Sequence, residues 1–387
     1  MNTQSDAFTQ FQGDIVTSVD QLLETPFHQW HAENQGRMVD FAGWSMPVQY
    51  NSIIKEHEQT RNAIGLFDVS HMGRLFFSGS NIDTFLDRLT TRRVAGMPVG
   101  RIRYSLMTNE TGGILDDVLV YHLANSDGDP FYMMVVNASN RTKIVNWLSA
   151  QIPTDSDIAI NDRTLKTGMI AVQGPKANAM VAEICSVNPA DLKYYTGTAA
   201  TIGEHTVILS RTGYTGEDGC ELIVESADAL ALWETLIERA GELGGGATGL
   251  AARDTLRLEA AMPLYGHELS EDINPAQTDL KFAINLKDRE FIGRNTIVTA
   301  NADPSLPVRI GLELEGKRAA REHCDILVDG NKVGVVTSGT FAPTVQKSIS
   351  MGYINRPLAE IGTDVEIDIR GKMAPAKVVA LPFYSRD

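Results

Sequence analysis

A glycine-rich turn at residues 210–224 constrains the fold more than any other stretch of the chain. Apolar runs at 207–209 and 222–224 flank it, which predicts two strands joined by an elaborated hairpin loop. Glycines recur in it at every third position, and glycine permits positive φ and close backbone approach. Glu221 stands at the foot of the outgoing strand, where a carboxylate can accept paired N–H donors from a ligand. An ordinary hairpin with solvated acidic side chains fits the same spacing.

Composition limits the class of protein. The 387 residues suggest two or three domains, and 43% hydrophobic with 21% charged residues suits a globular protein with a substantial core. No apolar run reaches the roughly 18 residues that a membrane span needs, so we expect no membrane partner. A net charge of −15 argues against nucleic acid as a partner, because phosphate binding needs a basic face.

The cysteines and the N-terminus bear on the compartment. Cys185, Cys220 and Cys324 lack the spacing of a metal site and are too few for a disulfide framework. The first residues lack the segments of a signal peptide and the arginines of a mitochondrial transit peptide. We therefore expect a cytoplasmic protein with no bound metal.

The order of predicted elements indicates an α+β fold in three parts. Residues 1–24 are a polar N-terminal extension, 25–300 form an α+β region, and 301–387 carry short β runs separated by turn signals. The α+β region repeats a hairpin-then-helix order, which predicts two pseudo-repeated modules with a ligand pocket between them. The last part is expected to form a small β-barrel or a jelly roll.

Local signals give finer predictions. Ser80 and Ser226 are expected to cap helices, and Pro175 is expected at the first position of another helix. Residues 244–249 spell the glycine pattern of a dinucleotide site, but they follow a predicted helix rather than a strand. A flexible turn is the better interpretation of that stretch.

Six segments, taken together, resemble one known family. They read DFAGWSMP at 40–47, GLFDVSHM at 65–72, GGILDD at 112–117, SRTGYTGEDGCELIV at 210–224, GLAARDTLRLEA at 249–260 and TSGTFAPT at 337–344. In this order they resemble the glycine-cleavage T-protein family of folate-dependent aminomethyltransferases, from about Thr25 to near Phe383. The resemblance implies a three-domain cloverleaf in which the two α+β modules form a folate pocket.

The resemblance also implies the reaction. An aminomethyl carbon would move from the lipoyl arm of the H-protein to tetrahydrofolate, releasing ammonia and forming 5,10-methylenetetrahydrofolate. Tetrahydrofolate is thus the expected cosubstrate, and the lipoylated H-protein of the glycine cleavage system is the expected partner. Such H-proteins are typically acidic, and we expect a basic patch for docking around the cavity entrance. The arginines of this predicted patch are Arg88, Arg92, Arg93, Arg101 and Arg103.

Matched motif positions supply the candidate site residues. Glu221 corresponds to the glutamate that binds the pteridine edge, and Arg253 to a folate-contacting arginine suited to the carboxylates of the folate tail. Tyr214 matches a pocket tyrosine, and Asp116 is the expected catalytic carboxylate, orienting the reacting nitrogens and stabilising positive charge. Three further residues match positions that line the pocket: Met72, Tyr104 and Asn137.

The two aspartates of the GGILDD segment are expected to have different roles. Asp116 and Asp117 are adjacent where a predicted strand begins, so their side chains should point to opposite faces. The family match predicts that Asp116 faces the ligand. Asp117 is then left for the turn or the outer face.

Other polar residues in the motifs receive structural interpretations. Arg257 is expected to be a structural partner of Asp254 or Glu259. His71 and His267 have no metal-type partner at ligand spacing, so we interpret them as structural or pocket-wall residues.

Two alternative functions share this fold. Iron–sulphur assembly factors bind folate without catalysis, but residues 288–294 lack the cysteine of their signature. A free-standing folate-dependent demethylase stays open, because folate contacts alone do not fix the carbon donor. Residues 273–282 also differ from many relatives, with Phe282 where tryptophan is frequent.

Overall fold

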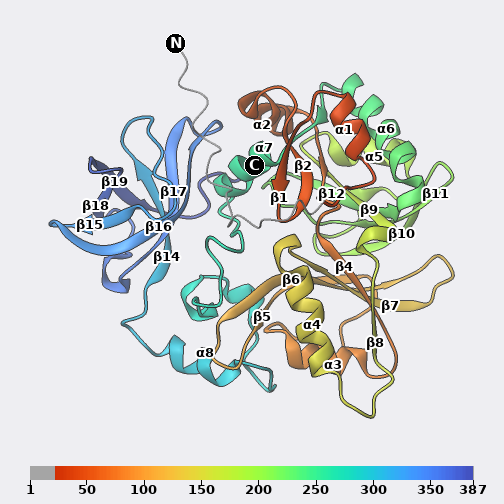
Figure 1. The fold of residues 1–387 in the computed structure, drawn as a ribbon, viewed down its shortest axis with the longest axis horizontal. Helices are drawn as coiled ribbons and strands as arrows, with labels where there is room; N and C mark the ends of the chain where they lie inside the picture. Colours follow the sequence, from red (N-terminus) through yellow and green to blue (C-terminus); the bar gives the residue numbers. More distant parts are fainter. Residues whose placement is uncertain (1–21, 387) are drawn as a thin grey trace.

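The computed structural model describes residues 22–386, which form three bodies around a common centre (Figure 1). A six-stranded sheet lies at the upper right of Figure 1, a five-stranded sheet at the lower right and a β-barrel at the left. The predicted extension at 1–24 falls almost wholly outside the described residues. The predicted α+β fold with a C-terminal barrel is confirmed.

The six-stranded sheet carries the glycine-rich turn. Its strands run in the order β10 (Gly197–Ile202), β11 (His205–Ser210), β12 (Gly219–Glu225), β9 (Thr167–Gln173), β3 (Gly65–Asp68) and β13 (Gly246–Ala247). β11 and β12 pair antiparallel, with Ser210 opposite Glu221, as the hairpin prediction requires. The turn therefore projects from one end of this sheet.

Helices α5 (Ala177–Ile184) and α6 (Ser226–Glu242) cover one face of that sheet (Figure 1). The face of α6 that packs on the sheet consists of Ala229, Leu232, Trp233, Leu236 and Ala240, at helical spacing. Each fully buried leucine in such a face stabilises the fold by about 1.5–3 kcal/mol. Apolar periodicity thus decides which side of α6 faces inward.

The five-stranded sheet is antiparallel throughout. Its order is β5 (Arg101–Thr108), β6 (Ile114–Ala124), β7 (Pro130–Val136), β4 (Gly73–Ser78) and β8 (Ala159–Asp162). Helices α3 (Ile82–Leu89) and α4 (Arg141–Gln151) cover one face. A shared core joins this sheet to the six-stranded sheet and includes Phe67, Tyr121, Met133, Ala171 and Ile223. The two modules are thereby packed directly on each other.

The C-terminal part is a closed barrel, so the jelly-roll alternative is wrong. Its order is β14 (Val308–Leu314), β17 (Lys347–Ile354), β16 (Asn331–Ala342), β15 (Asp325–Val328), β18 (Asp364–Asp368) and β19 (Met373–Val379), with β19 returning to β14. Closure leaves no unpaired sheet edge. The division predicted at residue 300 falls in the last turn of α8 (Arg294–Asn301).

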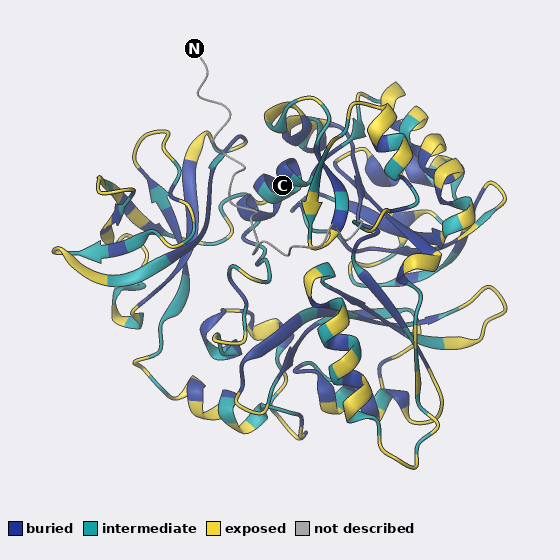
Figure 2. Ribbon diagram, in the orientation of Figure 1, coloured by how far each residue is buried: buried dark blue, intermediate teal, exposed yellow. Residues whose placement is uncertain are grey.

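Helix α7 (Leu250–Glu259) lies where the three bodies meet (Figure 1). It packs against α2 (Ile53–Asn62), β2 (Trp44–Gln49) and β16 of the barrel. β2 forms a hairpin with β1 (Arg37–Phe41), and the short helix α1 (His28–Glu33) precedes them. Figure 2 shows the sheet strands mostly buried and the outer helices exposed on one side. α7 therefore presents side chains to both modules and to the barrel.

The predicted cap of α3 is wrong. Asn81, in the left-handed region with φ of 56°, immediately precedes the helix and makes no side-chain capping bond. Ser80 Oγ donates instead to Asp157 Oδ2 at 2.9 Å. The Ser80 hydroxyl, predicted from local spacing to cap the helix, makes a tertiary hydrogen bond instead.

The starts of α5 and α6 also differ from the predictions. Glu225 precedes α6, so Ser226 is its first helical residue rather than its cap. α5 begins at Ala177, two residues after Pro175. Helix boundaries depend on backbone geometry that side-chain type alone does not fix.

Residues 244–249 are not simply a flexible turn. Gly246 and Ala247 form β13, which pairs parallel with Gly65 and Leu66 of β3. Gly249 precedes α7, and a Cβ added there would lie 2.4 Å from the Val48 carbonyl oxygen. Glycine is required because the backbone of β2 approaches this closely.

Candidate active site

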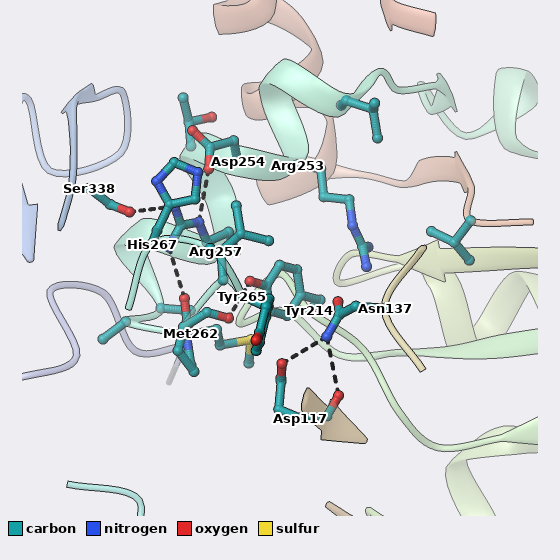
Figure 3. A pocket seen from close by; sticks show the side chains of 18 of the residues that line it. Asp117, Asn137, Tyr214, Arg253, Asp254, Arg257, Met262, Tyr265, His267 and Ser338 are labelled. Carbon is teal, nitrogen blue, oxygen red and sulfur yellow. Dashed lines mark hydrogen bonds and ion pairs between the residues drawn. The ribbon is translucent and has the colours of Figure 1, made fainter. Parts of the chain in front are cut away.

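A cavity of about 1470 Å³ lies between the two modules, α7 and the barrel (Figure 3). Six of the seven predicted site residues line it: Met72, Tyr104, Asn137, Tyr214, Glu221 and Arg253. Tyr104 and Glu221 lie on the two sheets and Arg253 lies on α7, whereas the other three lie in segments that connect strands or a strand and a helix. The fold therefore brings the predicted residues together, with the exception of Asp116.

Glu221 lies on β12 and is 5% exposed. Thr212 Oγ1 donates a hydrogen bond to its Oε2. Burial raises the pKa of Glu221, while the Thr212 bond and the charge of Arg253 lower it in part. Its other carboxylate oxygen makes no hydrogen bond within the described chain and is available to a donor in the cavity.

Arg253 reaches into the cavity from α7 (Figure 3). Its guanidinium carbon lies 4.8 Å from the centre of the Tyr214 ring and 6.0 Å from that of Phe67. Its Nη1 is buried and has no hydrogen-bond partner among residues 22–386. Burial lowers the pKa of Arg253, and the charge of Glu221 offsets part of this effect. A buried guanidinium group in a cavity, stacked but not hydrogen-bonded, is suited to an acceptor on a ligand.

Tyr214 and Tyr104 both form part of the cavity wall. The Tyr214 hydroxyl donates to the Pro263 carbonyl at 2.5 Å, which leaves the ring to face Arg253. Tyr104 stacks on Phe282, with ring centres 5.6 Å apart, at a point where Phe282 is 53% exposed. This aromatic pair marks an opening of the cavity to solvent.

The predicted orientation of the two aspartates is wrong. Asp117 lines the cavity, whereas Asp116 is fully buried and does not. Asp116 accepts from the Asn137 backbone N–H at 3.0 Å, from Asn137 Nδ2 at 2.8 Å and from Asn140 Nδ2 at 2.7 Å. The side chains do alternate along β6, as expected for a strand, but the face that each occupies is the reverse of the prediction.

Asp117 is held from two sides. It accepts a hydrogen bond from the Tyr104 hydroxyl at 3.0 Å. It accepts another from Asn137 Nδ2 at 2.8 Å (Figure 3). Burial raises the pKa of Asp117 to about 6, although both hydrogen bonds lower it. Burial and the charge of Asp117 raise the pKa of Asp116 to about 8. The pair is two neighbouring carboxylates that share the Asn137 amide and lack a cation within hydrogen-bond distance among residues 22–386.

Comparison with known proteins identifies the family. The GCVT N-terminal domain matches residues 27–288, and the glycine cleavage T-protein C-terminal barrel domain matches 308–385. Aminomethyltransferases of Bacillus cereus and Bacillus anthracis are 39% identical over 367 residues, covering 94% of this chain and 99% of each relative. The chain belongs to the glycine cleavage T-protein family.

A solved structure supports the same assignment for this T-protein. The crystal structure of glycine cleavage system aminomethyltransferase T from Bartonella henselae has a TM-score of 0.86 and 32% identity, and the match covers 94% of this chain and 98% of that one. The resemblance inferred from six motifs is confirmed, and the protein is an aminomethyltransferase enzyme. The assembly-factor and demethylase alternatives find no support in these matches.

One residue of the T-protein cavity was missed by the sequence motifs. Tyr195 lines the cavity, and its backbone is in the left-handed region with φ of 59°. Burial raises the pKa of Tyr195 to about 12, with smaller effects from the charges of Arg92, Glu221 and Asp117. No motif contains it, and only the segment's unusual backbone geometry, invisible in the sequence, marks the position.

Arg257 is structural, as expected, but one of its predicted partners is wrong. It pairs with Asp254 at 2.9 Å and with Glu268 at 2.8 Å, and it donates to Ser338 Oγ of the barrel at 2.8 Å (Figure 3). Glu259 belongs to a different cluster. Arg257 thus fastens α7 to the barrel at the wall of the cavity.

The two motif histidines lie in the cavity wall. Burial lowers the pKa of His71 to about 4, so its imidazole is neutral at pH 7, and its buried Nδ1 has no partner within residues 22–386. His267 Nδ1 lies 2.8 Å from Glu322 Oε2 and 3.2 Å from the Thr337 carbonyl. Both placements agree with the pocket-wall interpretation.

Residues 22–386 contain no group of three or more His, Cys, Asp or Glu side chains placed to hold a metal ion. Among the same residues, every helix is too short or too polar to cross a bilayer.

Proposed function

We propose that this T-protein binds tetrahydrofolate in the cavity and transfers to it the aminomethyl carbon carried by the lipoyl arm of an H-protein. Ammonia leaves, and 5,10-methylenetetrahydrofolate forms. The observation that carries the proposal is the pairing of two unsatisfied groups in one buried wall. Glu221 offers a free carboxylate oxygen, and Arg253 offers a free N–H.

The polar groups of the cavity fit a folate head group. A pteridine edge presents an exocyclic amine and a ring N–H beside a carbonyl oxygen. Glu221 is suited to accept from the two donors, and the Arg253 guanidinium is suited to donate to the carbonyl. Both groups line the same cavity, and the charge of Arg253 partly offsets the effect of burial on the pKa of Glu221. This placement favours a pteridine contact for Arg253 over the tail contact predicted from sequence.

Asp117, rather than Asp116, is the residue we assign to catalysis. Tetrahydrofolate supplies nucleophilic nitrogens when it is bound. The Asp117 carboxylate faces the cavity and is held by Tyr104 and Asn137, so it needs no reorganisation to orient those nitrogens. In a buried site, its negative charge would also stabilise the cationic character that develops as ammonia leaves. Asp116 would act behind it by holding Asn137.

The size of the cavity supports two substrates at once. Pockets for a single small ligand usually measure about 300–1,000 Å³, and this one is about 1470 Å³. Its barrel side is lined by residues that the folate assignment does not use, including His267, Arg321 and Ser338. That side is free for the arm of a lipoylated partner.

Cys185, Cys220 and Cys324 are all unpaired, which supports the predicted cytoplasmic setting.

A turnover assay tests the donor, and a binding assay tests the site. Aminomethyl-loaded H-protein with tetrahydrofolate should turn over, whereas dimethylated amine donors should not. Glu221→Gln should weaken tetrahydrofolate binding by about 1–3 kcal/mol, the cost of losing a charge-assisted hydrogen-bond pair. Calorimetry measures this loss, and circular dichroism checks that the variant is folded. Unchanged affinity in Glu221→Gln would remove Glu221 from the folate site.

A further inference from the structure

A lysine on α4 reaches a tyrosine of the cavity wall, and neither residue has a role in the proposed function so far. Lys143 Nζ donates to the Tyr265 hydroxyl at 2.9 Å and to Glu271 Oε1 at 3.0 Å. Tyr265 lines the cavity, and Lys143 Nζ lies 4.7 Å from the centre of its ring. The Lys143 side chain is 34% exposed, so its ammonium group can exchange protons with solvent. One ammonium and one hydroxyl group thus connect solvent to the cavity wall.

The Tyr265 hydroxyl is fixed to the strand that carries the two aspartates. It donates to the Ile114 carbonyl at 3.1 Å, and Ile114 begins β6, three residues before Asp117. The Ile114 N–H donates in turn to the Ser270 carbonyl at 3.1 Å. Tyr265, Asp117 and Asn137 all line the cavity (Figure 3). The segment that carries Tyr265 is therefore held against the start of β6, where the catalytic carboxylate is proposed to act.

The bond from Lys143 makes Tyr265 a better acid than burial alone would allow. Burial raises the pKa of Tyr265, whereas the hydrogen bond and the charge of Lys143 lower it. The charges of Glu271 and Asp116 raise it again. Burial lowers the pKa of Lys143, but its interactions with Tyr265 and Glu271 outweigh burial and raise it. Lys143 is therefore protonated at pH 7 and can return a proton to a tyrosinate.

The proposed reaction needs a proton donor that Asp117 does not supply. When the bond between the aminomethyl carbon and its nitrogen breaks, the electron pair stays on the nitrogen, which gains a proton to leave as ammonia. Asp117 is proposed to act in its ionised form, and an ionised carboxylate only accepts hydrogen bonds. The same carbon forms a bond to a folate nitrogen, which releases its own proton to solvent. Tyrosine and lysine are both side chains that serve as proton donors in enzymes.

We propose that Tyr265 donates the proton with which ammonia leaves and that Lys143 restores it. This inference rests on the proposed function and deepens it, because it names the acid of the reaction. The hydroxyl hydrogen, which the Ile114 carbonyl accepts in this structure, rotates about the C–O bond to the amine nitrogen. The Tyr265 phenolate then takes a proton from the Lys143 ammonium group, which takes one from solvent. The proton that the folate nitrogen releases balances that one, so this proton relay needs no further reactant.

Turnover of aminomethyl-loaded H-protein with tetrahydrofolate, on the full chain, tests the relay. Tyr265→Phe should lower kcat by about 10²-fold, the lower end of what a general acid contributes, and should leave the tetrahydrofolate Kd unchanged by calorimetry. Lys143→Gln should lower kcat by about tenfold, the scale of losing one charge-assisted hydrogen bond to the acid. Lys176→Gln is the matched control and should keep the wild-type kcat, because Lys176 is exposed and donates to the Leu243 carbonyl outside the cavity.

Lys143→Arg separates a relay from a positioning role. Arginine keeps the charge and the hydrogen-bond donors, but its guanidinium group does not give up a proton in proteins. Lys143→Arg should therefore be as slow as Lys143→Gln. Full activity of Lys143→Arg would show that Lys143 only positions Tyr265, and it would overturn the relay. The two Lys143 variants change a partly exposed side chain, so they decide the question if circular dichroism shows that Tyr265→Phe is unfolded.

The remaining outcomes distinguish this inference from the proposed function. A folded Tyr265→Phe variant with the wild-type kcat would remove the acid and leave the proposed function intact. Weaker tetrahydrofolate binding in Tyr265→Phe, with kcat unchanged, would make Tyr265 a folate contact instead. A wild type that does not turn over loaded H-protein would overturn the proposed function together with the relay.

Discussion

Two buried clusters of charged groups, both close to the cavity, differ in what balances the carboxylates. In the first, Asp116 and Asp117 lie together with amide and phenol donors, and no cation of the described residues 22–386 is within hydrogen-bond distance. In the second, Glu259 lies 2.8 Å from Arg61 Nη2 and 3.2 Å from His57 Nε2, and all three side chains are almost wholly buried. Burial raises the pKa of both aspartates, whereas in Glu259 it is outweighed by His57 and Arg61, which lower the pKa to about 2.

The second cluster joins parts of the molecule that are distant in sequence. Arg61 of α2 also pairs with Glu217 of the glycine-rich turn at 2.8 Å. The Tyr384 hydroxyl of the C-terminal segment donates to the same Glu217 at 2.7 Å, and the Thr344 N–H of the barrel donates to Glu259 at 2.8 Å. The comparison indicates that the two clusters have different roles. The compensated cluster joins the six-stranded module, α7 and the barrel, while the uncompensated pair keeps a charge available to a substrate.

The largest expected effect comes from breaking the compensated cluster. Glu259→Gln keeps the side-chain size but leaves Arg61 and His57 without their shared anion, so it should lower the free energy of unfolding by about 3–5 kcal/mol. Denaturant unfolding followed by circular dichroism measures this. Glu242→Gln removes an exposed partner of Arg239 instead and should cost less than about 1 kcal/mol. Equal losses in the two variants would contradict a joining role for Glu259.

Removing charge from the uncompensated pair should affect catalysis rather than stability. Asp117→Asn should lower kcat by roughly 10²-fold or more, the scale for losing one electrostatic stabiliser in an active site. Folate affinity should stay within a few-fold, because Glu221 and Arg253 provide it. Steady-state kinetics and calorimetry on the same preparation separate the two effects.

The neighbouring aspartate provides the matched variant. Asp116→Asn places an amide among the N–H donors of Asn137 and Asn140, so it should cost about 1–3 kcal/mol of stability. Its kcat should fall much less than that of Asp117→Asn. If Asp116→Asn were the inactive variant and Asp117→Asn were fully active, the sequence-based assignment would be restored.

The smallest effect is a difference in pH response. The raised pKa of Asp117 means that catalysis needing its ionised form should fall as pH decreases through about 6, roughly tenfold per unit below it. The same raised pKa makes the contribution of Asp117 to stability greatest in acid and lost as pH rises through about 6. Glu259 has the opposite sign: its contribution is present above the ordinary carboxyl range and is lost as pH falls toward about 2. A kcat profile with a midpoint near 4 would show that Asp117 is unperturbed.

The sequence by itself determined the elements and the chemistry available to them. Apolar runs and glycine turn signals located the 210–224 hairpin and the C-terminal strands. Motif order placed Glu221, Tyr214 and Arg253 in one cavity. The strand period also required Asp116 and Asp117 to face opposite ways.

Only the tertiary structure decided which face of the strand lines the cavity and which is buried behind it. A strand's two faces are equivalent until another element covers one of them. Here Asn137, directly after β7, and Asn140, in the 3-10 turn before α4, both donate hydrogen bonds to Asp116. The same holds for Ser80, whose hydroxyl donates to Asp157, and for Arg257, which pairs with Glu268 and donates to Ser338. Each depends on a partner from another part of the chain, and no local spacing encodes the distance between elements that meet only after folding.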